Sequence, residues 1–213
     1  MSKLKTKNSK LKTALALGVI ILGAGASSRM GRPKLLLPWK DKTVIGEIIR
    51  QWCELDAGQI AVVHHPNDSA LFAELDRLNL PSEDRIENPQ PELGMFSSIV
   101  CAANWTGWRN EISNWAIALG DQPHLQTGTL RTLLEFAVQN PDAICQPQFG
   151  GHARHPVILP HAAFAGLKTT PAESLKKFLK AVSCRRAVFA TNDSSLALDL
   201  DTPEDYQRVR AAV

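Results

Sequence analysis

The chain has 213 residues, a length that suits one α/β domain better than two. Its hydrophobic content of 44% can supply a large core and excludes a disordered composition. The formal net charge is only +3, and much of the basic excess lies in residues 1–13, so we expect no binding to nucleic acid. We expect these residues to form a basic N-terminal tail, followed by a single domain over residues 14–213.

Short strand-type runs alternate with helix-type runs along the chain. Thr43, Asp68 and Thr202 are placed to cap helices, and Pro171 fits the first turn of another helix. Alternation of this kind predicts an α/β fold with a three-layer, Rossmann-like, mixed but mostly parallel sheet. The expected strands cover residues 16–22, 59–65, 84–89, 114–119, 142–147, 155–160, 185–190 and 196–200. The expected helices cover residues 43–55, 68–78, 94–104, 126–140, 171–182 and 202–212.

The first strand lies in a stretch that also resembles a secretory signal. Residues 10–28 combine a basic start, an apolar run and small residues, and the run is too short for a confident membrane span. A cleaved signal gives no reason for the dense polar loop that follows, with Arg29, Arg32 and Lys34. A buried strand followed by a ligand loop explains both halves, so we favour it and expect no membrane association.

The four cysteines favour a reducing compartment. No pair has the spacing C-x-x-C, and no cluster of Cys and His has zinc-site spacing. Free cysteines in apolar segments are typical of cytosolic proteins, so we expect a cytoplasmic protein.

The loop after the first strand, "GAGASSRMGRPK", has the residue types of an anion site. Gly23 and Gly25 are expected to allow positive φ and a close approach of the backbone to a bulky anion. Ser27 and Ser28 can add hydroxyl donors, and two cations follow at positions 29 and 34. Together these groups suit a triphosphate.

Two other interpretations of this loop explain less. A dinucleotide-binding fold needs a third glycine where Ser28 stands and an acid after the second strand, which ends "AVVHHP". A plain turn between strand and helix would explain the glycines, but not the cluster of polar residues.

Three acidic residues lie near the predicted carboxyl edge of the sheet, where open α/β sheets bind ligands. Asp121 follows a buried strand in the turn "GDQP", and Asp199 and Asp201 lie in "LALDLDTPED". If the latter segment is a strand, its two carboxylates share one face. We expect Asp199 to be a solvated residue at a strand end.

The glycine loop and several later segments resemble the motifs of a known family. "LGAGASSRMGRPKLLLP" resembles the signature L-A-A-G-x-S-x-R-M-G-x-x-K-x-L-L-P of the sugar-nucleotide and molybdopterin nucleotidyltransferases. The chain is most similar to the molybdenum cofactor cytidylyltransferase-like branch. Four further pieces match in order, and the resemblance extends from about residue 14 to about residue 208: "ENPQPELGMFSSI", "GDQP", "GGHARHPVIL" and "LDLDTPEDY".

The resemblance implies roles for particular residues. Asp121 and Asp201 would bind the Mg²⁺ that accompanies a nucleoside triphosphate. The implied catalytic residues are Arg29, Lys34 and Asp121. The implied nucleotide-binding residues are Leu22, Gly23, Ala24, Gly25, Ser27, Ser28, Arg29, Lys34, Gly94 and Ser98. The implied acceptor-binding residues are Gly151, Arg154 and His155, with Arg154 standing where the family usually has glycine.

The implied reaction is transfer of CMP from CTP to the phosphate of molybdopterin or the molybdenum cofactor, with release of pyrophosphate and with a molybdenum hydroxylase as a possible client. Gly23-Ala24-Gly25 matches neither the Ala-Ala-Gly usual in the cytidylyl branch nor the Ala-Gly-Gly of the guanylyl branch, so transfer from GTP stays open. A sugar-phosphate nucleotidyltransferase and a maturation factor that transfers nothing also stay open.

Overall fold

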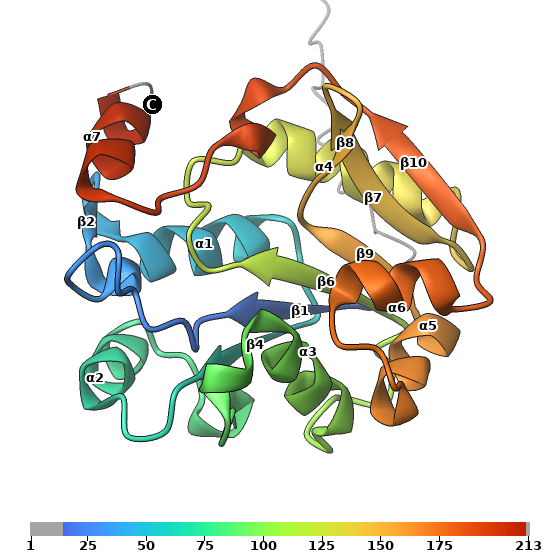
Figure 1. Ribbon diagram of the computed structural model, residues 1–213, viewed down its shortest axis with the longest axis horizontal. Coiled ribbons are helices and arrows are strands. Elements are labelled where there is room, and N and C mark those ends of the chain that lie inside the picture. Colours follow the sequence, from blue (N-terminus) through green and yellow to red (C-terminus); the bar gives the residue numbers. More distant parts are fainter. Residues whose placement is uncertain (1–14, 212–213) are drawn as a thin grey trace, which may run out of the picture.

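The computed structural model describes residues 15–211, which form three layers around one sheet (Figure 1). The basic tail expected over residues 1–13 lies outside the described residues. The strands are β1 (Leu17–Leu22), β2 (Pro38–Trp39), β3 (Lys42–Thr43), β4 (Gln59–His64), β5 (Arg85–Glu87), β6 (Asn114–Leu119), β7 (Ile144–Phe149), β8 (His152–Ala153), β9 (Val157–Pro160) and β10 (Arg186–Ala190).

The main sheet has the strand order β10-β7-β9-β6-β1-β4-β5, with β8 paired to β7. Strand β1 lies near its centre and pairs in parallel with β4 and β6, so that Val19 lies between Ile60 and Ala116. Its continuous apolar run is typical of a strand that is buried on both faces. Strand β9 runs antiparallel to β6 and β7. The predicted mixed, mostly parallel sheet is therefore confirmed.

Helices cover both faces of the sheet (Figure 1). Apolar residues of α1, α2, α4 and α7 share one hydrophobic cluster, and those of α3, α5 and α6 share the other. The helices are α1 (Val44–Glu54), α2 (Ser69–Arg77), α3 (Met95–Asn104), α4 (Thr127–Val138), α5 (His161–Gly166), α6 (Leu175–Ala181) and α7 (Pro203–Ala211).

The three predicted helix caps are confirmed. The side chains of Thr43 and Asp68 each accept a hydrogen bond at 3.1 Å from a backbone N–H three residues on. Thr202 and Asp205 form a reciprocal capping box at the start of α7: the Asp205 N–H donates to the Thr202 hydroxyl oxygen at 3.1 Å, and the Thr202 N–H donates to the Asp205 carboxylate at 3.1 Å.

The strand predicted over residues 196–200 is wrong. Ser194–Ala197 form the 3₁₀ helix η5, and residues 198–202 have no regular structure. The Asp193 side chain accepts from the Ser195 N–H at 2.9 Å, which starts a helical turn where the prediction had a strand. Leu196 and Leu200 are buried at a spacing of four residues, so the apolar pattern reflects a turn packed on the core. The two aspartates of this segment therefore do not share the face of a strand.

The prediction for Pro171 is also wrong. Helix α6 begins at Leu175, because Ser174 caps it by accepting from the Lys177 N–H at 3.2 Å, and Pro171 lies in the preceding loop. Helix α5 and the short strands β2, β3 and β8 were not predicted from the sequence. These elements are two to six residues long, too short for a periodic signal.

All four cysteines are free. Among the helices of the described residues, none combines the length and apolar character needed to cross a membrane.

Candidate active site

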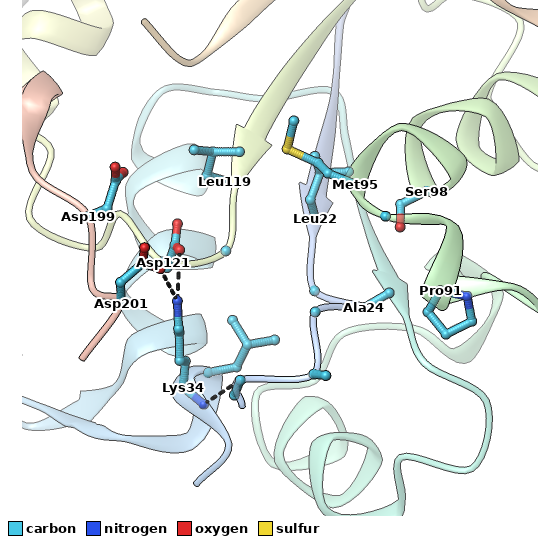
Figure 2. A pocket seen from close by; sticks show the side chains of 17 residues that line it. Leu22, Ala24, Lys34, Pro91, Met95, Ser98, Leu119, Asp121, Asp199 and Asp201 are labelled. Carbon is cyan, nitrogen blue, oxygen red and sulfur yellow. Dashed lines mark hydrogen bonds and ion pairs between the residues drawn. The ribbon is translucent and has the colours of Figure 1, made fainter. Parts of the chain in front are cut away.

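A cavity of about 450 Å³ lies at the carboxyl ends of β1 and β6 (Figure 2). Its walls come from four segments that are distant in the sequence: the glycine loop after β1, the start of α3, the turn after β6 and the segment before α7. Figure 2 shows two unlike walls, with Lys34, Asp121 and Asp201 on one side and Pro91, Met95 and Ser98 on the other. The sheet thus brings a charged wall and a largely apolar wall to one ligand-sized space.

Two glycines of the cavity are required by close packing. A Cβ atom on Gly23 would lie 2.9 Å from the Val63 carbonyl oxygen, and one on Gly120 would lie 2.5 Å from the Leu22 carbonyl oxygen. The expectation of positive φ at Gly23 and Gly25 is wrong, because the loop places positive φ at Ser27 (50°) and Gly31 (70°) instead. At Gly23 the chain still lies beside β4, since the Gly23 N–H donates to the Val63 carbonyl oxygen at 2.8 Å.

A hydrogen bond closes the part of the glycine loop between Ser27 and Lys34. The Lys34 N–H donates to the Ser27 hydroxyl oxygen at 3.1 Å, and Met30 is buried beneath the loop with 4% of its surface exposed. Ser27 lines both the cavity and an adjoining groove of about 620 Å³, whereas Ser28 lines the groove but not the cavity. The bond from Lys34 therefore holds Ser27 at the edge of the cavity, which residues 23–27 of the loop line.

Four sequence-predicted residues meet at the charged wall. The Lys34 ammonium nitrogen lies 2.7 Å from Asp201 Oδ1 and 3.3 Å from Asp121 Oδ2. Arg29, although 70% of its side chain is exposed, forms an ion pair with Asp201 Oδ2 at 2.6 Å. The two carboxylates come from positions 80 residues apart, and a single cation bridges them.

The two carboxyl groups have opposite pKa shifts. Burial raises the pKa of Asp121 above its usual range, against the attraction of Lys34, and the negative charge of Asp199 raises it further. The hydrogen bond from Lys34 lowers the pKa of Asp201, which is less buried. A second cation near Asp121 would favour its charged form.

Asp199 is not a strand-end residue, and although it is largely exposed, it lines the cavity. Its Oδ1 accepts a hydrogen bond at 3.1 Å from the buried side chain of Gln122, which follows Asp121 in the turn after β6. On α1, the Gln51 amide fixes the same turn by donating to the Pro123 carbonyl at 2.8 Å. The segment before α7 is thus tied to the turn that carries Asp121.

The opposite wall is organised by Asn88, which lies in the matching piece "ENPQPELGMFSSI" but for which no role was predicted. Asn88 is fully buried, and its Nδ2 donates to the hydroxyl oxygens of Ser97 at 2.8 Å and Ser98 at 3.0 Å. Gly94 begins α3 with φ 87° and ψ −177°, a conformation that is essentially confined to glycine. In the sequence, Asn88 also begins an Asn-Pro pair at a strand end, a local pattern that is typical of a turn.

The comparison with protein families decides the assignment. A family model described as the MobA-like NTP transferase domain matches residues 19–189. The chain belongs to this family. It is therefore a nucleotidyltransferase by descent, in agreement with the resemblance of its glycine loop.

The relatives of this MobA-like domain have different names. This chain is 24% identical over 191 residues to the molybdenum cofactor cytidylyltransferase of Escherichia coli, and the match covers 90% of this chain and 94% of that protein. It is 26% identical over 208 residues to the purine catabolism protein PucB of Bacillus subtilis, covering 91% and 96%. Family membership thus leaves the acceptor undetermined.

A solved structure has the same fold. The Rv0371c protein of Mycobacterium tuberculosis has a TM-score of 0.74 at 23% identity, with 93% of this chain and 98% of that chain covered. A second structure of Rv0371c, a complex with manganese, has a TM-score of 0.69 at 21% identity, covering 93% and 100%.

The metal-binding capacity of the MobA-like domain follows from its donor set. Across residues 15–211, no group of three or more His, Cys, Asp or Glu side chains is arranged to enclose a metal ion. Asp121 and Asp201 nevertheless converge on one cation, the Lys34 ammonium. Mg²⁺ typically takes one or two carboxylates and completes its shell with waters and phosphates. The residues present therefore fit a divalent cation that arrives with a nucleotide.

The three predicted acceptor-binding residues lie outside the lining of this cavity. Gly151, with φ 78°, is in the turn between β7 and β8. Arg154 is half-buried, and its N–H donates to the Pro147 carbonyl oxygen at 2.8 Å. Burial lowers the pKa of His155, whose Nδ1 lies 3.3 Å from the Ile117 carbonyl oxygen. Their binding to an acceptor stays a prediction.

Proposed function

We propose that this MobA-like domain transfers CMP from CTP to the phosphate of a molybdopterin-type acceptor, in a reaction that requires Mg²⁺ and releases pyrophosphate. We further propose that residues 14–213 act as one domain, with Gly151, Arg154 and His155 on the acceptor side and a molybdenum hydroxylase as possible client. The observation that carries the proposal is the meeting of Lys34, Asp121 and Asp201 beside the glycine loop, at the carboxyl edge of the sheet.

The charged wall suits the triphosphate. Lys34 and Arg29 are cations of the glycine loop, and both are paired with carboxylates. A divalent cation on Asp121 and Asp201 would take over that pairing and leave Lys34 free to contact phosphate oxygens. Bound Mg²⁺ supplies positive charge that offsets the negative charge gathered on the phosphates in the transition state.

The chain's residues need only position and stabilise the reacting groups. An oxygen of the acceptor phosphate forms a bond to the α-phosphorus, and the bond from the α-phosphorus to the bridging oxygen breaks as pyrophosphate leaves. A phosphate monoester has a second pKa of about 6, so its oxygen is already largely ionised and needs no strong general base. Lys34 and the loop N–H groups hold the α-phosphate in line for the attack.

The choice of CTP rests on the family branch. The pieces "KLLLP", "GDQP" and "DTPEDY" favour the cytidylyl branch as a set, and the Escherichia coli relative carries that name. The name of the Bacillus subtilis relative is compatible with another acceptor. The guanylyl branch differs in the base alone and leaves the chemistry unchanged.

The test is a pyrophosphate-release assay with Mg²⁺, molybdopterin and each of the four nucleoside triphosphates. We expect release with CTP, and a loss of at least about 100-fold in Asp121→Asn and in Asp201→Asn, because each removes a proposed metal ligand. Asp76→Asn is the matched control, since it changes an exposed aspartate that is paired with Arg85 at 2.6 Å.

Each different outcome points to a specific error. Release with GTP alone would keep the chemistry and assign the guanylyl branch. Nucleotide binding without release would favour another acceptor, for which sugar phosphates are tested next, or a maturation factor. Equal activity of Asp121→Asn and wild type would contradict the proposed metal site.

A further inference from the structure

The apolar wall of the cavity contains one buried polar side chain, that of Ser98. Ser98 lines the cavity and is 4% exposed. Its neighbours on that wall, Pro91, Gly94 and Met95, offer no side-chain hydrogen-bonding group. The charged wall suits phosphates, so the nucleobase would lie against this side (Figure 2). The hydrogen-bond direction at Ser98 then bears directly on which base is accepted.

That direction is set by Asn88. The Gln90 N–H donates to Asn88 Oδ1 at 3.0 Å, which fixes the orientation of the Asn88 amide, since only its oxygen can accept. The amide nitrogen of Asn88 must therefore face the serines, and it donates to Ser98 Oγ at 3.0 Å. Ser98 consequently accepts from Asn88 and keeps its own hydrogen for another partner.

Ser97 and Ser98 differ in what they do with that hydrogen. The Ser97 hydroxyl can donate to the Gly94 carbonyl oxygen at 2.8 Å or to the Gln90 carbonyl oxygen at 3.1 Å. Within the described part of the chain, the Ser98 hydroxyl has no acceptor in hydrogen-bond distance. A buried donor that is left unpaired costs free energy, so a ligand that supplies an acceptor gains by pairing with it.

We propose that Asn88 is a positioning residue that presents Ser98 as a hydrogen-bond donor to an acceptor atom on the edge of the nucleobase, and thereby favours cytosine over guanine. Cytosine carries two adjacent acceptors, O2 and N3, whereas the corresponding edge of guanine carries two N–H donors beside one acceptor. A fixed donor pairs with the first edge and meets donors on most of the second. This inference rests on the proposed function and names a determinant of its base specificity.

The experiment measures binding of CTP and GTP, each with Mg²⁺ and without acceptor, by isothermal titration calorimetry. We expect Ser98→Ala to raise the Kd for CTP by about 5- to 10-fold and the Kd for GTP by less than about 2-fold. Ser97→Ala is the matched control, because Ser97 accepts from the same Asn88 amide but does not line the cavity. It should leave both Kd values within about 2-fold of wild type, although it removes more hydrogen bonds and lowers Tm further than Ser98→Ala does.

Asn88→Asp tests the positioning residue itself. An aspartate has no N–H to donate, so the Ser98 hydroxyl would turn and donate to it, and only lone pairs would face the base. We expect the ratio of the Kd for GTP to the Kd for CTP to fall toward one. If Asn88 had a purely structural role, Asn88→Asp would weaken the binding of CTP and GTP alike. If Asn88→Asp fails to fold, the comparison of Ser98→Ala with Ser97→Ala provides the test.

The results separate this inference from the proposed function. The inference alone is overturned if Ser98→Ala leaves the ratio of the Kd for GTP to the Kd for CTP unchanged. It is also overturned if Ser97→Ala changes that ratio equally. A wild-type domain that binds no CTP would overturn both.

Discussion

Lys34 Nζ lies 2.7 Å from Asp201 Oδ1, and the same nitrogen lies 3.3 Å from Asp121. An ammonium group thus occupies the space between the two carboxylates that we propose as metal ligands. Only 14% of the Lys34 side chain is exposed, so water screens the attraction weakly. A divalent cation that comes alone has to compete with this lysine.

We therefore predict that Lys34→Met binds Mn²⁺ more tightly than wild type in the absence of nucleotide, by about 10-fold. The physical reason is that the variant removes the resident cation and leaves both carboxylates. The same variant should bind CTP more weakly, because it loses a phosphate contact. Electron paramagnetic resonance of free Mn²⁺ measures the first effect, and Lys42→Met is the control, since Lys42 pairs with the exposed Asp41. Equal Mn²⁺ affinity in Lys34→Met and wild type would contradict the competition.

The opposite pKa shifts of Asp121 and Asp201 predict opposite effects on stability. Burial raises the pKa of Asp121, so the stability that its carboxyl contributes is present at low pH and is lost as pH rises through the raised pKa. Lys34 lowers the pKa of Asp201, so its contribution is present above the usual carboxyl range and is lost as pH falls. Near neutral pH, Asp121→Asn should raise Tm by about 1–2 °C, and Asp201→Asn should lower it by a similar amount.

Thermal unfolding at pH 7 and at pH 3 measures both effects. At pH 3 the difference between Asp121→Asn and wild type should shrink, because the wild-type carboxyl is then protonated. Two variants that change Tm in the same direction at pH 7 would show that burial does not dominate at Asp121.

The two glycines of the loop should respond differently to alanine. A Cβ on Gly23 would lie 2.9 Å from the Val63 carbonyl oxygen and 3.0 Å from Leu35, so Gly23→Ala should destabilise the fold by about 1–3 kcal/mol. A Cβ on Gly25 would meet no described atom within 4 Å, so Gly25→Ala should change stability by less than about 0.5 kcal/mol. Because Gly25 lines the cavity, its variant should instead weaken CTP binding. Urea unfolding and calorimetry separate the two effects.

The cap of α7 should affect both stability and the site. Thr202→Ala removes the hydroxyl that accepts from the Asp205 N–H at 3.1 Å, and we expect a loss of about 1 kcal/mol. Thr202→Ser retains the hydroxyl and should be close to wild type. Because Asp201 precedes the cap directly, Thr202→Ala should also lower the rate of pyrophosphate release, whereas a variant that loses stability alone would show that α7 does not position Asp201.

The sequence by itself determined the layered α/β fold and most of the site. Runs of Val and Ile, such as that of β1, are typical of buried strands and can be recognised without knowing their neighbours in space. Caps such as Thr43 define where helices begin through hydrogen bonds between residues about three positions apart. The glycine loop could be found because its residue types follow a strand, whereas the metal roles of Asp121 and Asp201 were implied by the resemblance to the family's motifs.

The tertiary structure alone decided which groups meet. Contacts such as Lys34 with Asp121 join residues 87 positions apart, and no local pattern encodes them. The role of Gly23 depends on the approach of β4, and the turn of η5 is held in place because Leu196 packs on the core. Asn88 donates to Ser97 and Ser98, and these two bonds form only when α3 packs beside β5. Such relationships depend on how the elements pack, since packing energies are set by neighbours in space and not by neighbours in sequence.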